Sequence, residues 1–284
     1  MRSPIIASLS LWLFIALPAS GGKNDADSSA RLNIVLFLID DLGWMDVGCN
    51  GSSYYQTPNI DRLAREGARF TDAYAACAVC SPTRAAVLTG KYPARLLLTD
   101  WLPSGRWNPK ARLLEGRRVR ALPVEEFTLA EALREAGYRT ASIGKWHLGS
   151  EPFSLPERHG FDVNVAGNGH GAPGNYFFPY NGNWKISTTR LRVKWNTLPD
   201  GEPGEYLTDR LTDESVKFIR ESQDKPFFLA EGLFQPHPLS TRPENISIKS
   251  CLRQWNCRLT SRGTSPISPP EAGKWPPTDR GTCG

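Results

Sequence analysis

The sequence predicts an α/β protein with a mostly parallel central sheet flanked by helices. Three apolar runs of strand length lie at residues 33–39, 140–143 and 226–233, and segments with helical spacing of apolar residues lie between them. The first run is apolar throughout and β-branched at several positions, which is typical of a strand buried on both faces. Strands that alternate with helices favour parallel pairing.

Capping residues indicate where the helices between these runs begin and end. Thr57 and Pro58 open a helix that Gly67 closes, and Thr128 with Glu131 forms a capping box at the start of a later one. The remaining expected elements are a short strand at residues 68–73 and helices at 82–89, 128–136 and 205–222. Two segments rich in Gly, Pro and aromatic residues, 101–122 and 150–203, predict long loops or small hairpins over the sheet edge.

Both ends of the chain differ from the rest. Arg2, an apolar run at 5–17 and the small residues after it predict a signal peptide over residues 1–22. We therefore expect export to a periplasm, the cell exterior or a secretory lumen. The run is short for a bilayer and no other stretch is as apolar, so no stable membrane span is expected. Residues 239–284 are Pro-rich without an apolar period, which predicts an irregular tail, disordered or not native to the domain.

The formal net charge of +5 does not indicate nucleic-acid binding. Residues 235–284 carry seven Lys and Arg against three Asp and Glu, so the excess of basic residues lies almost entirely there. The rest of the 284-residue chain is close to neutral and has no basic stripe interleaved with aromatic residues. Nucleic acid is therefore not an expected partner.

The most informative motif is Cys80-Ser81-Pro82-Thr83-Arg84. A Pro in a first helical turn pre-sets the helical φ angle, so Cys80 is expected at a helix N-terminus. Free backbone N–H groups and the helix dipole favour an anion at that place. Arg84 lies one turn along on the same face and can direct its guanidinium there. The motif predicts an oxyanion site with a modifiable side chain at its floor.

The other cysteines give weaker signals. Cys77 precedes Cys80 by three residues, but no second pair or His follows at zinc spacing, and the Pro comes after the pair rather than within it. A zinc site and a thioredoxin-like redox pair are therefore disfavoured. In an exported protein Cys49 and Cys77 could pair with each other, and the three cysteines of the tail could form other bridges.

Two further polar groups follow predicted strands, at the edge where open α/β sheets place their sites. Asp40 and Asp41 come directly after the first apolar run. Adjacent carboxylates there either cap a helix beside an exposed neighbour or need a cation to neutralise them. Lys145 and His147 follow the second run between glycines. In an extended segment both would face the same side, which suits binding a dianion and moving protons.

Together these motifs resemble the type I, formylglycine-dependent sulfatases of the alkaline-phosphatase-like superfamily. The Cys80 motif with the following Leu-Thr-Gly-Lys is similar to the family signature, Asp-Asp-x-Gly to its metal motif, and Gly-Lys-Trp-His-Leu-Gly to its Lys/His motif. The resemblance implies that residues 32–238 form a partial N-terminal catalytic domain with a sheet incomplete at its C-terminal side. The family's further metal ligands, an Asp and an Asn or Gln, and another Lys have no counterpart after His237.

The resemblance implies an arylsulfatase-like sulfuric ester hydrolase that uses Ca²⁺. Cys80 would be oxidised to formylglycine by a formylglycine-generating enzyme during export. Asp40, Asp41 and the modified Cys80 are the implied Ca²⁺ ligands. The expected substrate is a sulfated small molecule or a sulfated carbohydrate, and the sequence leaves the choice between aryl sulfate and sulfated sugar open.

The resemblance also assigns roles to four other residues. Arg84 and Lys145 would neutralise the sulfate oxygens, with Lys145 bridging sulfate and formylglycine. His147 would hydrogen-bond the formylglycine hydroxyl. His237, in Gln-Pro-His-Pro after the last apolar run, would contact the sulfate ester and protonate the leaving oxygen.

Two other functions stay open at the level of sequence. A phosphonate or phosphate monoester hydrolase of the same fold would bind a tetrahedral oxyanion of similar size in the same cradle. A truncated, inactive sulfatase-like protein would bind a sulfated ligand or have no activity. Comparison of sulfate and phosphate esters separates the first from a sulfatase, and the chemical state of Cys80 separates the second.

Overall fold

A computed structural model of the chain describes residues 31–103, 110, 112–113, 116–180, 183–186, 189–192 and 195–234. The predicted signal peptide, His237 and the predicted irregular tail lie outside these residues.

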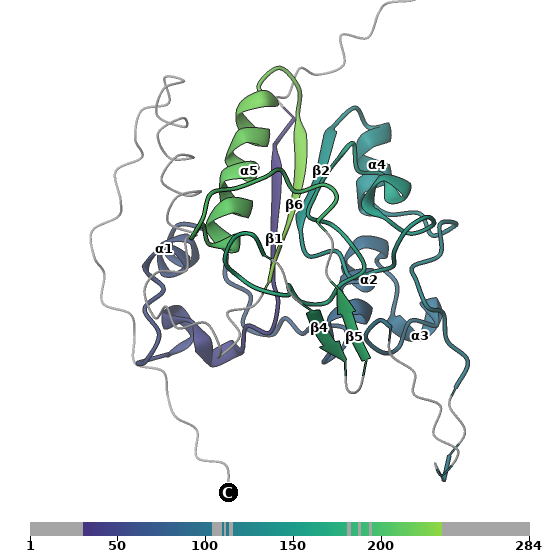
Figure 1. The fold of residues 1–284 in the computed structure, drawn as a ribbon. Coiled ribbons are helices and arrows are strands. Elements are labelled where there is room, and N and C mark those ends of the chain that lie inside the picture. The colour runs from purple at the N-terminus through teal and green to yellow at the C-terminus, as the bar shows by residue number, and fades with distance from the viewer. Residues whose placement is uncertain are drawn as a thin grey trace, which may run out of the picture. The chain divides into compact units, whose positions relative to one another are not determined.

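The core of the described structure is a four-stranded parallel sheet in the order β1-β6-β2-β3 (Figure 1). Its strands are β1 (Ile34–Ile39), β6 (Phe227–Leu233), β2 (Arg139–Gly144) and β3 (Val163–Val165). The last strand along the chain, β6, lies between the first and the second. The α/β class with a mostly parallel sheet is thus confirmed.

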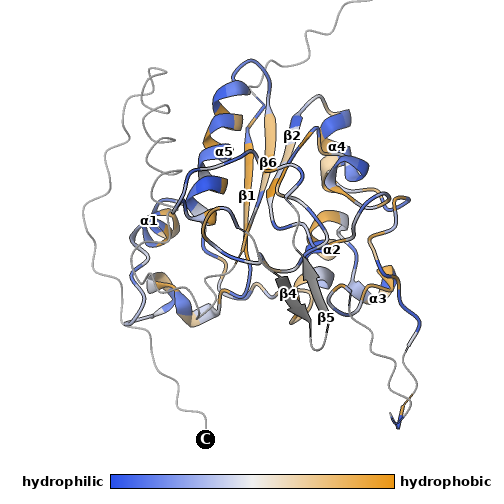
Figure 2. Ribbon diagram, viewed as in Figure 1, coloured by the Kyte–Doolittle hydropathy of each residue, from blue (hydrophilic) through white to orange (hydrophobic). Residues whose placement is uncertain are grey.

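Helices cover both faces of this sheet. Because successive strand residues point to opposite faces, Phe227 and Leu229 of β6 pack under α5 (Leu207–Glu221), while Phe228 packs under the other layer. That other layer contains α2 (Cys80–Thr89) and α4 (Leu129–Glu135). In Figure 2 β1 is apolar along its length, whereas α5 carries its polar residues on the outward side and buries Leu207, Leu211 and Phe218 toward the sheet.

The predicted capping signals agree with the helix starts. Thr128 accepts a hydrogen bond from the backbone of Glu131, whose side chain accepts from the Thr128 amide, which completes the capping box of α4. The smaller elements are α1 (Pro58–Glu66), α3 (Pro93–Leu96), the 3₁₀ helices Trp44–Asp46, Gly48–Asn50 and Pro156–His159, and an antiparallel hairpin of β4 (Asn183–Ile186) and β5 (Thr189–Arg192). The hairpin lies in the segment where the sequence predicts loops or small hairpins.

One predicted strand is wrong. Residues 68–73 form no regular structure, and all of them are exposed, with Phe70 at 76%. A strand needs a neighbour to pair with its backbone groups. In the described sheet β1 pairs with β6 alone, and residues 68–73 join neither. The possible disulfide between Cys49 and Cys77 is also wrong, because both residues are free thiols.

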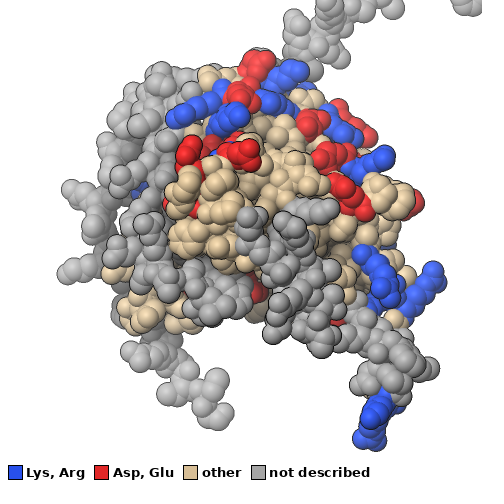
Figure 3. All heavy atoms as spheres, viewed as in Figure 1, with Lys and Arg blue, Asp and Glu red and all other residues tan. Residues whose placement is uncertain are grey.

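Charged side chains of both signs mix on the surface seen in Figure 3. On α5, for example, Arg210 forms ion pairs with Glu205 and Glu214. The described residues on this face thus form no continuous stripe of one sign, in line with the charge balance of the sequence. Among the helices of the described residues, none is both long enough and apolar enough to cross a membrane.

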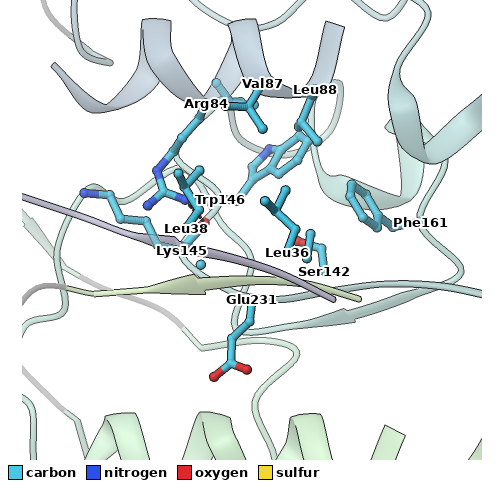
Figure 4. A pocket seen from close by; sticks show the side chains of 13 residues that line it. Leu36, Leu38, Arg84, Val87, Leu88, Ser142, Lys145, Trp146, Phe161 and Glu231 are labelled. Carbon is cyan, nitrogen blue, oxygen red and sulfur yellow. Dashed lines mark hydrogen bonds between the residues drawn. The ribbon is translucent and has the colours of Figure 1, made fainter. Parts of the chain in front are cut away.

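A carboxylate is buried between the sheet and α5. Glu231 on β6 is 1% exposed and points away from Arg84 and Trp146 (Figure 4). Within the described structure its two carboxylate oxygens have no hydrogen-bond partner of ordinary geometry, although the Ser215 hydroxyl of α5 faces them. Burial raises the pKa of Glu231 from an ordinary value of 4.5 to about 7.

Glu231 is therefore expected to make the stability of the fold depend on pH. Its pKa is higher in the folded than in the unfolded chain, so its stabilising contribution is complete below the unfolded pKa and is lost as the pH rises through about 7. Between about pH 4 and pH 8 the unfolding free energy of the parent should fall by about 3 kcal/mol more than that of Glu231→Gln. Denaturant melts at the two pH values measure this difference.

The matched control for this prediction is Glu135→Gln, because Glu135 is exposed on α4. That variant should follow the pH dependence of the parent. Equal pH dependence of the parent and Glu231→Gln would show that the buried carboxyl does not titrate as expected.

Candidate active site

Cys80 is the first residue of α2, as the motif predicts. Val79 is extended with φ −132° and ψ 158°, and the helix runs from Cys80 until Gly90, whose φ of 66° ends it in a left-handed conformation. Ala85 and Leu88 are buried against the sheet and hold this helix in place. Cys80 is partly buried, and burial raises the pKa of its thiol. The unmodified side chain is therefore a thiol at neutral pH rather than a reactive thiolate.

Asp40 follows β1 directly at the carboxyl end of the sheet. Its amide donates to the Leu233 carbonyl at 3.3 Å, which continues the pairing of β1 with β6 by one residue. Its side chain is 10% exposed and lies between two cations: Oδ1 accepts from Arg84 Nη2 at 3.2 Å, and Oδ2 pairs with Lys145 Nζ. Burial opposes ionisation of Asp40, but Lys145 and Arg84 outweigh it and hold the pKa below its usual value.

Arg84 joins three elements of the site. Besides its ion pair with Asp40, its Nη1 donates to the Lys145 carbonyl at 2.7 Å, and the residue is 5% exposed. This close approach depends on two glycines at the strand ends. A β-carbon on Gly232 would lie 2.9 Å from Arg84 Nη1, and one on Gly144, whose φ is +91°, would lie 2.2 Å from the Gly232 carbonyl oxygen.

The path of the chain after β2 differs from the predicted extended segment. Gly144 and His147 both have positive φ, 91° and 58°, so the backbone bends between Lys145 and His147 instead of alternating. Both side chains are nevertheless buried, at 6% and 1% exposed, and each lies within electrostatic range of the other. The bend, and not strand alternation, brings them together.

His147 is a neutral imidazole in this environment. Burial and the nearby Lys145 lower its pKa to about 3. Its Nε2 hydrogen-bonds the Leu102 carbonyl, which can only accept, so the proton is on Nε2. At neutral pH the ring can donate or accept hydrogen bonds but does not supply a positive charge.

The predicted site residues that the structure describes converge at one edge of the sheet. Asp40, Arg84 and Lys145 contact one another directly, and Cys80 and Asp41 lie within electrostatic range of this group. Tyr176, in the predicted loop region, also lies near the two aspartates; burial raises the pKa of its hydroxyl, and Tyr206, Asp40 and Asp41 raise it further.

The predicted calcium ligands do not form a ready-made metal site. Among the described residues no group of three or more His, Cys, Asp or Glu side chains is placed to hold a metal ion. Asp40 faces Arg84 and Lys145 instead. The donor chemistry nevertheless fits: two adjacent carboxylates supply the hard oxygen ligands that Ca²⁺ prefers, although Ca²⁺ takes about six to eight of them.

A small cavity lies beside this site, between α2 and the sheet. Its volume of about 30 Å³ has room for one or two water molecules. Arg84 and Lys145 turn their nitrogen atoms toward the same end of it, while Trp146, Leu36 and Phe161 line the rest (Figure 4). The cavity is lined mostly by apolar side chains and is too small to hold a sulfate ester.

Comparison with known proteins now assigns the fold and the motifs to a family. The family model described as Sulfatase matches residues 32–257. This chain belongs to the sulfatase family. Over 246 residues it is 34% identical to N-acetylgalactosamine-6-sulfatase of Canis lupus familiaris, with 82% of this chain and 45% of the relative covered. Arylsulfatase G of Rattus norvegicus is 34% identical over 256 residues, with 82% and 46% covered.

Solved structures agree with this assignment. Ps i-CgsB has 33% sequence identity and a TM-score of 0.57, with 75% of this chain and 47% of that chain covered. BT4656 in complex with its substrate D-glucosamine-2-N,6-O-disulfate has 30% identity and a TM-score of 0.52, with 73% and 35% covered. This sulfatase-family chain spans less than half the length of the curated relatives named above.

Sequence reasoning missed three contributors to the site of this sulfatase-family chain. Ser81 lies inside the quoted motif, but nothing in its type showed that its hydroxyl would bond the His147 carbonyl. Leu102 contributes through its backbone, which the sequence pattern does not reveal. Gly232 had a visible signal, since a glycine inside a strand run often marks a close approach of another backbone.

Proposed function

We propose that this chain carries the catalytic residues of an arylsulfatase-like sulfuric ester hydrolase, with Cys80 converted to formylglycine and Ca²⁺ bound at Asp40 and Asp41. The observation that carries the proposal is the pair of buried cations, Arg84 and Lys145, held by one carboxylate beside Cys80. Such a pair presents fixed positive charge to a tetrahedral oxyanion without any reorganisation during the reaction.

The state of Cys80 supports the need for a modified side chain. Burial raises its thiol pKa, and a sulfur nucleophile would retain the sulfate group it accepted. The hydrate of formylglycine supplies two hydroxyl groups on one carbon, which meets the separate demands of accepting sulfate and releasing it. Position 80 suits this chemistry because it lies at a helix N-terminus, where backbone N–H groups favour an anion.

The charges of the site give a reason for a divalent cation. Asp40, Asp41, Arg84 and Lys145 have no net charge when all are ionised. A monoanionic sulfate ester would leave the site with one uncompensated negative charge, which is costly at a buried position. When bound, Ca²⁺ would more than offset this one negative charge and would polarise the sulfuryl oxygens. Asp40 and Asp41 would hold it, with the oxygen of the modified Cys80.

The two histidines have different proposed roles. His147, neutral at physiological pH, would hydrogen-bond the hydroxyl at position 80 and not act as an acid, because its pKa of about 3 is too low for proton donation to an alcohol at neutral pH. His237 would contact the sulfate ester and protonate the leaving oxygen.

We propose sulfated carbohydrates or sulfated small molecules as substrates. The relatives named above include N-acetylgalactosamine-6-sulfatase, and one solved neighbour is in complex with D-glucosamine-2-N,6-O-disulfate. The proposal includes a formylglycine-generating enzyme as partner during export, and a periplasmic, extracellular or secretory-lumen location. Residues 32–238 form the proposed catalytic domain, residues 1–22 the signal peptide and residues 239–284 an irregular tail.

Parallel assays of a chromogenic aryl sulfate and the matching phosphate monoester test this function. We expect Ca²⁺-dependent release of sulfate, with kcat/KM at least about tenfold above that for phosphate, which corresponds to about 1.4 kcal/mol of discrimination. Mass spectrometry of the Cys80 peptide from the same preparation should show the aldehyde. Faster phosphate release would favour the phosphohydrolase, and an unmodified Cys80 without activity would favour the inactive protein.

A further inference from the structure

Ser81 is a fully buried hydroxyl in the first turn of α2. Its side chain is 0% exposed, and its Oγ makes two hydrogen bonds to backbone groups distant in sequence. It donates to the His147 carbonyl at 2.8 Å and accepts from the Leu102 amide at 3.1 Å. The Leu102 carbonyl in turn accepts from His147 Nε2. These three hydrogen bonds form a closed circuit through Ser81, Leu102 and His147. The circuit ties α2 to the backbone carbonyl of His147 and, through Leu102, to its ring.

The circuit holds a strained residue. His147 has φ +58°, a left-handed conformation that costs a non-glycine residue about 1–2 kcal/mol. A residue in this conformation stays there only when its surroundings hold it. The His147 amide donates to the Asn168 carbonyl at 3.0 Å, and Ser81 holds the carbonyl on the other side. The ring direction is thus set by backbone contacts on both sides of its α-carbon.

We propose that Ser81 is a positioning residue that fixes the direction of the His147 ring by binding the His147 carbonyl and the Leu102 amide together. The inference rests on the proposed function for its catalytic consequence, but its structural part stands alone. Removing the hydroxyl leaves the His147 carbonyl and the Leu102 amide without this partner, so Leu102, whose carbonyl orients Nε2, is no longer held to α2. The ring would then sample other directions beside Lys145 and Arg84.

The test compares Ser81→Ala with Thr89→Val in the full chain. Thr89 is a matched control on the same helix: its Oγ1 donates to the Ala85 carbonyl at 2.7 Å, and Val removes that one hydroxyl at equal size. Oγ1 also accepts from the Lys91 amide at 3.3 Å, just past the end of α2, so both of its hydrogen bonds are local and neither involves His147. Both variants lose a hydroxyl that binds the backbone, but only one loses the circuit.

The first readout is the His147 Nε2 proton in an NMR spectrum near neutral pH, which does not depend on activity. The bond to Leu102 should protect this proton from exchange with water in the parent and in Thr89→Val. In Ser81→Ala the signal should disappear or exchange at least about tenfold faster. An unchanged signal in Ser81→Ala overturns the proposal, and so does a parent ring that carries its proton on Nδ1. The parent measurement alone overturns the proposal if the proton is on Nδ1, whether or not Ser81→Ala folds.

The second readout is whether the variant changes kcat or KM. We expect Ser81→Ala to lower kcat by at least about tenfold with KM changed less than about threefold, because the cations that bind sulfate stay in place. Thr89→Val should keep both values. Equal loss in the two variants would indicate a general effect on α2 and overturn the proposal. If the parent releases no sulfate, the proposed function fails while the NMR result still decides the role of Ser81.

Discussion

Replacement of Cys80 by alanine should abolish sulfate release from a chromogenic aryl sulfate while leaving the fold intact. In the proposed mechanism the side chain at position 80 provides the attacking oxygen, and the surrounding cations cannot replace it. Loss of a nucleophile lowers kcat by on the order of 10³-fold or more. The fold should persist because Cys80 is partly exposed at the first helical position and alanine favours helices.

Cys77→Ala is the control for this prediction. Cys77 is also a free, partly buried thiol, but it lies outside α2. Its replacement should keep most of the activity, so a general requirement for thiols can be separated from the role of position 80. Circular dichroism and thermal melts of both variants check the fold. Undiminished sulfate release by Cys80→Ala would refute the assignment of the nucleophile.

Replacement of Asp40 by asparagine should destabilise the protein more than any other single change at the site. Asp40 is the shared counter-ion of Arg84 and Lys145, which are 5% and 4% exposed at their side chains. Without it, two like charges remain buried beside each other. Breaking a buried ion pair from one side costs about 3–5 kcal/mol. Denaturant unfolding at neutral pH measures the loss, and sulfate release should fall with it.

The adjacent Asp41 provides the control for this experiment. Asp41 is exposed, so Asp41→Asn should cost less than about 1 kcal/mol. A double variant, Asp40→Asn with Lys145→Met, should recover part of the lost stability because it removes one of the unpaired cations. Equal stability of the parent and Asp40→Asn would show that the two cations do not depend on this carboxylate.

The pH dependence gives an independent check on Asp40. Its pKa is lower in the folded than in the unfolded chain, so its contribution is present above the unfolded pKa and is lost as the pH falls through the folded one. The stability difference between the parent and Asp40→Asn should therefore shrink in acid. Glu231 acts in the opposite direction, and the two effects can be separated by their variants.

The sheet and the place of the site could be predicted because both follow from short-range patterns. The apolar run ending at Ile39 is long enough for one buried strand, and Asp40 had to emerge at its carboxyl end. Pro82 and Gly90 marked the bounds of α2, which placed Cys80 and Arg84 on one helical turn. These inferences depend on local backbone preferences, which can be read from the residue types themselves.

The features that could not be predicted depend on contacts between distant segments. Residues 68–73 have the composition of a strand. A strand also needs a neighbouring strand to pair with, and composition does not show whether one is present. The left-handed conformation of His147 is stabilised by Asn168 and by Ser81, which lies 66 residues away in the chain. The buried carboxyl of Glu231 breaks the apolar pattern without any local signal of its environment.

The absence of side chains on Gly144 and Gly232 has a consequence for redesign. The main-chain atoms at the strand ends limit how closely the Arg84 guanidinium approaches the sheet, while the Asp40 carboxylate holds its other nitrogen. In the proposed function, changes in the surrounding loops would therefore alter substrate preference without moving the anion subsite that Arg84 and Lys145 form. Conversely, a single methyl group at either glycine would displace that subsite as a whole, whatever the loops contain.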